Sequence, residues 1–187
     1  PVLRTVGNMV CGPDEMTDVV LSQPGAAQQL VALLQQDHKA LVKESCWVVS
    51  NVAAGTPAHR DALAGAGVLP ALVHVLKTAH FDIRKEAAFA LYSFVRDERY
   101  EQTMLRPDLL EEFVSLLRAP DVQVVDLALA VVEILVANVE GGPRVVEEAD
   151  GIDALEQIVY KSSSNPELLA RASALLDKYY GEDAEPY

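Results

Sequence analysis

The sequence predicts an all-α fold built from helical repeats. Two rows of apolar residues share spacings of 42, 41 and 42 residues along the chain. The rows are Leu30, Leu72, Phe113 and Leu155 and, four positions later, Leu34, Leu76, Leu117 and Val159. Periods of a few tens of residues are typical of repeat architectures. No segment shows the sustained two-residue alternation of a half-buried strand, so we expect essentially no sheet.

The elements of each repeat can be assigned in chain order. Residues 1–10 have the pattern of the end of an incomplete repeat. Medium-length helices are expected where apolar residues recur at i, i+3 and i+4 around the two rows, at 26–34, 69–77, 109–117 and 152–160. A shorter segment with Gly or Pro at its edges precedes each of them, as at 56–67 and 142–151. Gly and Pro interrupt helices at those edges.

A longer and more uniformly apolar helix follows each medium one, as at 41–54 and 121–137. A helix that is apolar on most sides is a buried one. Three helices within about 42 residues match the armadillo pattern, with HEAT repeats as the close competitor. We therefore expect about four armadillo repeats and the end of a preceding one over residues 1–180, stacked as a right-handed superhelical solenoid. Residues 181–187 are expected to form an acidic C-terminal tail.

Composition limits the class of function. The net charge of −13 disfavours direct nucleic-acid binding, which depends on lysine and arginine meeting phosphates. Basic ligands are the natural partners of such a chain. The two cysteines, Cys11 and Cys46, are too few for a disulfide framework, and a reducing compartment fits them best. No apolar run of about 18 residues is present that would span a membrane, and the first residues do not resemble a secretory signal.

A second periodicity runs along the long helices. Arg4, Trp47 and Phe89 form one row, and Asn8, Asn51 and Ser93 form another row four positions later. Residues at i and i+4 share one helix face, so stacked repeats would align both rows along one groove.

This ladder has a chemistry suited to an extended basic peptide. An asparagine amide can both donate to and accept from a peptide bond, while an aromatic ring can hold a lysine stem and its ammonium group. Glu44 and Glu86 stand three residues before the aromatic positions, where they would meet the charge. The alternative is that Trp47 and Phe89 are core residues between repeats and that Asn51 bonds only within its own helix.

At these residues the chain resembles importin-α, the nuclear-import adaptor, over almost its whole length. The resemblance is carried by LRTVGNMVCGPDEMTDVVL, KESCWVVSNVAAG, AHFDIRKEAAFALYSF and LLDKYYGEDAE. It implies repeats six to ten of that family, with its minor groove for nuclear-localisation signals. The resemblance also implies three partners: Lys/Arg-rich peptides of cargo proteins and, for the full-length protein, a nuclear export receptor and importin-β. It implies a location in cytoplasm and nucleus.

Carried over by position, the resemblance assigns a set of residues to peptide binding. The set is Arg4, Asn8, Val10, Thr17, Glu44, Trp47, Ser50, Asn51 and Glu86, with Phe89 and Ser93 where the family has a second Trp and Asn. Phenyl is a weaker cation–π partner than indole, and a serine hydroxyl cannot make the paired amide contact. An importin-α-like scaffold or assembly factor that binds a protein partner without reading localisation signals therefore stays open.

The sequence carries no arrangement typical of an enzyme. The histidines, His38, His59, His74 and His80, have no metal-binding spacing and are expected at the surface. Nucleotide-binding glycine motifs are absent, so we expect no cofactor. Cys46 lies within a buried helix, where a cysteine behaves as a small apolar residue.

Overall fold

Helices make up the regular structure of the residues that the computed structural model describes, 2–161 and 165–181. No strand occurs in that part of the chain. The chain divides into two compact units, residues 1–97 and 98–187, and each is considered separately. The prediction of an all-α fold is confirmed.

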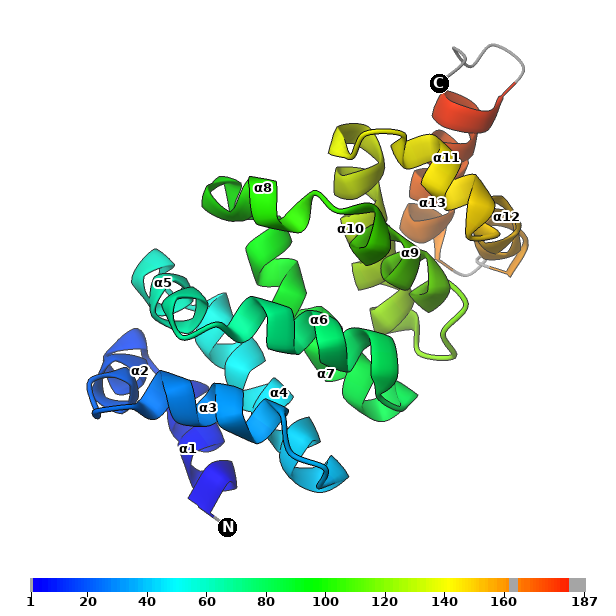
Figure 1. The fold of residues 1–187 in the computed structure, drawn as a ribbon. Coiled ribbons are helices and arrows are strands. Elements are labelled where there is room, and N and C mark those ends of the chain that lie inside the picture. The colour runs from blue at the N-terminus through cyan, green and yellow to red at the C-terminus, as the bar shows by residue number, and fades with distance from the viewer. Residues whose placement is uncertain (1, 162–164, 182–187) are drawn as a thin grey trace. The chain divides into compact units, whose positions relative to one another are not determined.

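Unit 1 contains short, medium and long helices in the order that the predicted repeat requires. Its elements are α1 (Val2–Val10), α2 (Asp14–Leu21), α3 (Ala26–Leu34), α4 (Lys39–Ala54), α5 (Pro57–Gly65), α6 (Val68–Thr78) and α7 (Phe81–Val95). The long helix α4 packs between α1 and α7, α3 packs on α4 and α6, and α2 packs on α5. Figure 1 shows the medium helices α3 and α6 lying along the long helices α4 and α7 that they contact.

Unit 2 has the same order of short, medium and long helices, but its first short segment is only a 3₁₀ turn and a four-residue helix. Its elements are the 3₁₀ turn η1 (Glu98–Tyr100), α8 (Glu101–Met104), α9 (Pro107–Leu116), α10 (Val122–Asn138), α11 (Gly142–Glu148), α12 (Gly151–Lys161) and α13 (Pro166–Tyr180). The medium helix α9 packs on the long helix α10, and α12 packs on α13. The predicted tail at 181–187 lies outside the described residues except for Gly181.

The two apolar rows form the core of both units. Leu72 and Phe113 are fully buried, and the other members of the rows are at most 5% exposed except Val159, which is half-buried. Burying a side chain of this size stabilises the fold by about 1.5–3 kcal/mol. The predicted period is therefore the period of the core.

His59 corrects one expectation, because it is buried rather than at the surface. Its Nδ1 accepts a hydrogen bond of 3.1 Å from the backbone N–H of Thr56, whose hydroxyl caps α5 in return. The ring proton is therefore on Nε2, which lies 2.9 Å from Asp18 Oδ1. His59 thus joins the start of α5 to α2, and a polar ring can be buried because both nitrogens have partners. His38, His74 and His80 are exposed as expected.

Candidate functional site

The long helices of unit 1 bring together most of the residues that the ladder predicted. We call this set the ladder face: Arg4 and Asn8 of α1, Glu44, Trp47, Ser50 and Asn51 of α4, and Glu86, Phe89 and Ser93 of α7. Arg4 and Asn8 are exposed and the others are half-buried. No member is sealed in the core, so a ligand can reach the face.

Arg4 covers Trp47 and pairs with Glu44. The guanidinium carbon of Arg4 lies 4.9 Å from the centroid of the Trp47 ring. Its Nη2 donates to Glu44 Oε2 at 2.7 Å, and its Nε lies 2.5 Å from Oε1. The pair is thus one charge-assisted hydrogen bond with a second close contact between the charged groups, and a hydrogen bond between charged groups is stronger than one between neutral groups. The face therefore already holds one basic side chain, which comes from the chain itself.

Gly7 lets α1 approach Trp47 closely. A Cβ built on Gly7 would stand 2.0 Å from Cζ3 of the indole, a distance that no real contact reaches. Trp47 is therefore held at its edge by the backbone of α1, one helical turn from Arg4. Sequence reasoning did not identify Gly7 as part of the site, although its position between Arg4 and Asn8 on one helix was visible.

Asn51 and Ser50 both bond within their own helix. Asn51 Nδ2 donates to Trp47 O at 2.9 Å, and Ser50 Oγ donates to the same carbonyl at 2.8 Å. The alternative interpretation of Asn51 is thus correct about this contact, but the contact uses only one amide proton. Among the described residues no hydrogen bond reaches Asn51 Oδ1, so the amide retains an acceptor and a second N–H for a ligand.

Glu86 is a carboxylate in a partly desolvated position. Burial raises its pKa above the ordinary 4.5, Lys85 and Lys43 lower it, and the charge of Glu44 raises it. Glu86 is thus close enough to Glu44 for their charges to interact, although 42 positions separate them. A cation placed here would offset the cost of burying the charge of Glu86 and its repulsion by Glu44.

Two residues of the predicted set lie beneath the surface. Val10 is 4% exposed and Thr17 is 3% exposed, so their side chains offer almost no area to a ligand. Cys46 is fully buried, and burial raises its pKa to about 12, which keeps the thiol protonated and unreactive. The expectation that Cys46 acts as a small apolar residue is confirmed.

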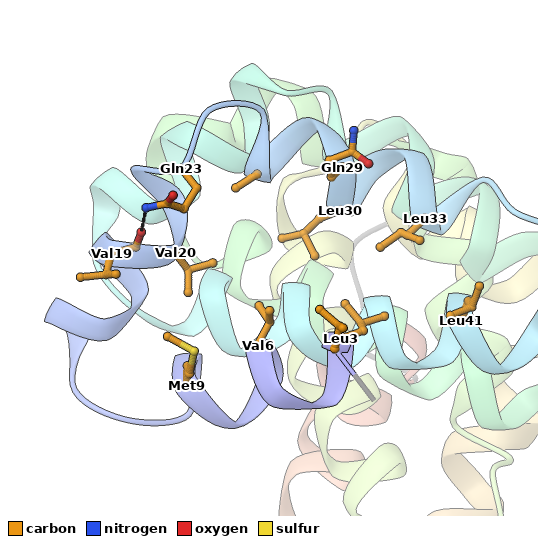
Figure 2. A pocket seen from close by; sticks show the side chains of 12 residues that line it. Leu3, Val6, Met9, Val19, Val20, Gln23, Gln29, Leu30, Leu33 and Leu41 are labelled. Carbon is orange, nitrogen blue, oxygen red and sulfur yellow. Dashed lines mark hydrogen bonds between the residues drawn. The ribbon is translucent and has the colours of Figure 1, made fainter.

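A second candidate site is an apolar pocket of about 710 Å³ on the other side of α1. Figure 2 shows Leu3 and Val6 of α1 on one side of it and Leu30 and Leu33 of α3 on the other. Val19 and Val20 of α2 and the start of α4 complete the lining.

The repeat pattern explains the pocket. Further along unit 1, the medium helix α3 packs against both the long helix α4 and the next medium helix α6. One repeat earlier, α1 is the long helix and α3 is the next medium helix, and the pocket lies between them. The pocket is thus at the position that a medium helix would fill. The sequence did not predict this pocket, because the pocket exists only where no medium helix packs on α1 and α3.

Other classes of site find no support in the described residues. They contain no group of three His, Cys, Asp or Glu side chains that could hold a metal ion. No helix within them is long and apolar enough to cross a membrane.

Comparison with repeat families and with solved structures identifies the type of helical repeat. The Armadillo/beta-catenin-like repeat model matches residues 13–54 and 56–93. A designed armadillo repeat protein in complex with the peptide (KR)4 superposes with a TM-score of 0.74 and 26% identity, over 94% of this chain and 72% of that one. A computationally designed armadillo protein for modular peptide recognition gives a TM-score of 0.76 and 26% identity over 94% and 73%. The chain has the armadillo-repeat fold, and residues 13–54 and 56–93 carry the sequence pattern of the repeat.

The sequence comparison is more specific. Importin subunit alpha-9 of Arabidopsis thaliana is 33% identical over 98% of this chain, and importin subunit alpha-2 of Oryza sativa subsp. japonica is 32% identical over the same share. The chain spans about two fifths of the length of these relatives, 38% in both cases. The chain is thus similar to importin alpha subunits over nearly its whole length.

Proposed function

We propose that the ladder face of unit 1 binds a lysine- and arginine-rich peptide in extended form. The observation that carries this proposal is Trp47, which is half-buried and bears a cation on its ring. That cation is paired with Glu44, whose charge interacts with that of Glu86. A ring that attracts one guanidinium has the right chemistry for another basic side chain, at about 0.5–2 kcal/mol per contact. Asn51 supplies the hydrogen bonds to the peptide backbone.

The resemblance to importin-α subunits gives this binding a role. We infer that the chain serves a nuclear-import adaptor in which the peptide is the nuclear-localisation signal of a cargo protein. The complete protein would then act in cytoplasm and nucleus, with importin-β and a nuclear export receptor as partners. The designed armadillo repeat protein that forms a complex with (KR)4 has the same fold as this chain, which supports the peptide class.

A scaffold that binds a folded protein partner is the second candidate. Phe89 and Ser93 favour it, because α7 lacks the indole and amide that α4 provides. In this case the ladder face would bind basic peptides no better than any other acidic surface would.

A labelled lysine–arginine octapeptide, titrated by fluorescence anisotropy at two salt concentrations, separates the candidates. We expect saturable binding that weakens with salt. Trp47→Ala should weaken it several-fold through the lost cation–π contact. Asn51→Ala should lose about 1–3 kcal/mol of binding free energy if a buried peptide group is left unpaired.

The matched controls are Tyr92→Ala and Asn138→Ala. Tyr92 is a half-buried aromatic residue of α7 that carries Arg96 at 5.1 Å, outside the ladder face. Asn138 makes the same bond within its helix as Asn51, to Ile134 O at 2.7 Å, but in unit 2. If the controls weaken binding as much as Trp47→Ala and Asn51→Ala do, the ladder face is not the site and the scaffold function replaces it.

A further inference from the structure

Arg4 occupies the same surfaces that a basic ligand side chain would use. Its guanidinium stacks on Trp47 at 4.9 Å and forms an ion pair with Glu44 that includes one hydrogen bond. A guanidinium is planar and weakly hydrated, which makes it well suited to an aromatic face. The aromatic wall and the carboxylate of this position are therefore both in use before any ligand arrives.

Contacts other than those of Arg4 also hold α1 in place. Gly7 already brings the backbone of α1 against the indole ring, and Val10 is buried beneath the helix. The Arg4 side chain itself is 63% exposed, whereas that of Glu44 is 19% exposed. An ion pair that is exposed on one side is screened by water, so its contribution to stability is modest. Its larger effect is on what else can reach Trp47 and Glu44.

We propose that Arg4 fills a basic-side-chain subsite in cis, made of Trp47 and Glu44, and so limits which peptide residues the ladder face accepts. The proposal rests on the proposed function and identifies Arg4 as a competitor of the peptide within the same chain. A peptide arginine must displace a group that is tethered beside the ring and competes at high effective concentration. In the wild-type protein a peptide side chain reaches Trp47 only by displacing Arg4, whereas the subsites that include Glu86 and Phe89 of α7 are open without this displacement.

The test compares Arg4→Ala, Arg4→Lys and Arg96→Ala with the wild-type protein. Arg96→Ala is the matched control, because it also removes an arginine stacked on an aromatic ring of unit 1 and changes the net charge equally. Arg4→Lys keeps the charge and the stem but not the planar guanidinium, so it still tests the proposal if Arg4→Ala fails to fold. Circular dichroism checks the helical content of each variant.

Two readouts are needed. The first is anisotropy with the lysine–arginine octapeptide, in which we expect Arg4→Ala to bind roughly threefold or more tightly than Arg96→Ala, with Arg4→Lys between. The second uses arginine amide as the probe and the fluorescence of Trp47, which is the single tryptophan of the chain. Arginine amide should change this fluorescence saturably in Arg4→Ala, at a concentration roughly threefold or more lower than in the wild-type protein.

The two readouts distinguish the inference from the function on which it rests. Saturable arginine amide binding by Arg4→Ala, with no octapeptide binding by any variant, would support the subsite and reject the peptide function. Octapeptide binding by the wild-type protein, with no gain in Arg4→Ala or Arg4→Lys over Arg96→Ala, would overturn the inference and leave the function intact. Absence of a saturable response to arginine amide in a folded Arg4→Ala would also overturn it.

Discussion

At the scale of single residues, Trp47 organises the ladder face. Arg4 covers its ring, Gly7 contacts its edge, and its carbonyl accepts hydrogen bonds from Ser50 and Asn51. A large aromatic side chain with this many fixed neighbours loses little freedom when a ligand binds, which favours affinity. Glu86 differs from Trp47, because its charge is only partly compensated.

Glu86→Gln should separate stability from binding. Burial raises the pKa of Glu86 in the folded state above 4.5, so the carboxylate disfavours folding once it ionises. This penalty is absent below pH 4.5, where both states are protonated, and is complete above the raised folded pKa. Thermal unfolding should therefore show Glu86→Gln to be the more stable protein at about pH 7 and equal to wild type at about pH 4.

The same substitution should weaken binding of the basic octapeptide at neutral pH, because an amide cannot pair with an ammonium group. Glu156→Gln, at an exposed position of α12, is the control for the loss of one charge. A Glu86→Gln protein that is less stable than wild type at neutral pH would show that Lys85 and Lys43 outweigh the burial, against this prediction.

Phe89→Trp combined with Ser93→Asn should strengthen peptide binding. Indole is a better cation–π partner than phenyl, and the amide adds a donor and an acceptor, so we expect a gain of roughly threefold to tenfold. Anisotropy with the octapeptide measures it, and Tyr92→Trp on the same helix controls for added aromatic area. An unchanged affinity would mean that α7 does not contact the ligand.

At the scale of elements, α1 has two different faces. Arg4, Gly7 and Asn8 belong to the side at Trp47, whereas Leu3 and Val6 line the apolar pocket. An isolated helix of nine residues is marginal in water, so α1 depends on packing for its structure. The pocket leaves the second face of α1 without a covering helix among the described residues.

The apolar pocket should bind the dye ANS in the isolated chain. The lining of the pocket is almost entirely apolar, which suits an apolar ligand. Val19→Lys with Leu33→Lys should lower ANS fluorescence without changing the circular dichroism, because both residues line the pocket near its surface. Tyr160→Lys removes an apolar side chain that is 87% exposed in unit 2 and should have little effect. An equal loss of signal in all variants would argue against dye binding in the pocket.

The elements also show what the sequence could and could not predict. The medium and long helices were predictable because their apolar residues recur with the period of the repeat, and those residues are the core. The burial of His59 was not predictable, because its partner Asp18 is 41 positions away. The spacing predicted that Arg4 lies in line with Trp47 and Phe89. It could not predict that the Arg4 guanidinium stacks on the ring of Trp47.

At the scale of the whole molecule, charge is distributed unevenly between the two units. Residues 98–187 hold 19 of the 28 acidic residues but only 7 of the 15 basic ones. Residues 1–97, which carry the ladder face, are nearly neutral, with 9 acidic and 8 basic residues. The contacts proposed for the peptide are thus in one unit, while most of the long-range attraction for it originates in the other.

Neutralising exposed acids of unit 2 should therefore slow association without changing dissociation. The substitutions are Glu111→Gln, Glu140→Gln and Glu156→Gln, all at exposed positions outside the ladder face. At about 10 mM ionic strength the Debye length is about 30 Å, so distant charges still steer a basic peptide. Stopped-flow anisotropy should show association slowed roughly twofold or more at this ionic strength and unchanged at high salt, where charges are screened. A faster dissociation in the triple variant would instead place these glutamates in direct contact with the peptide.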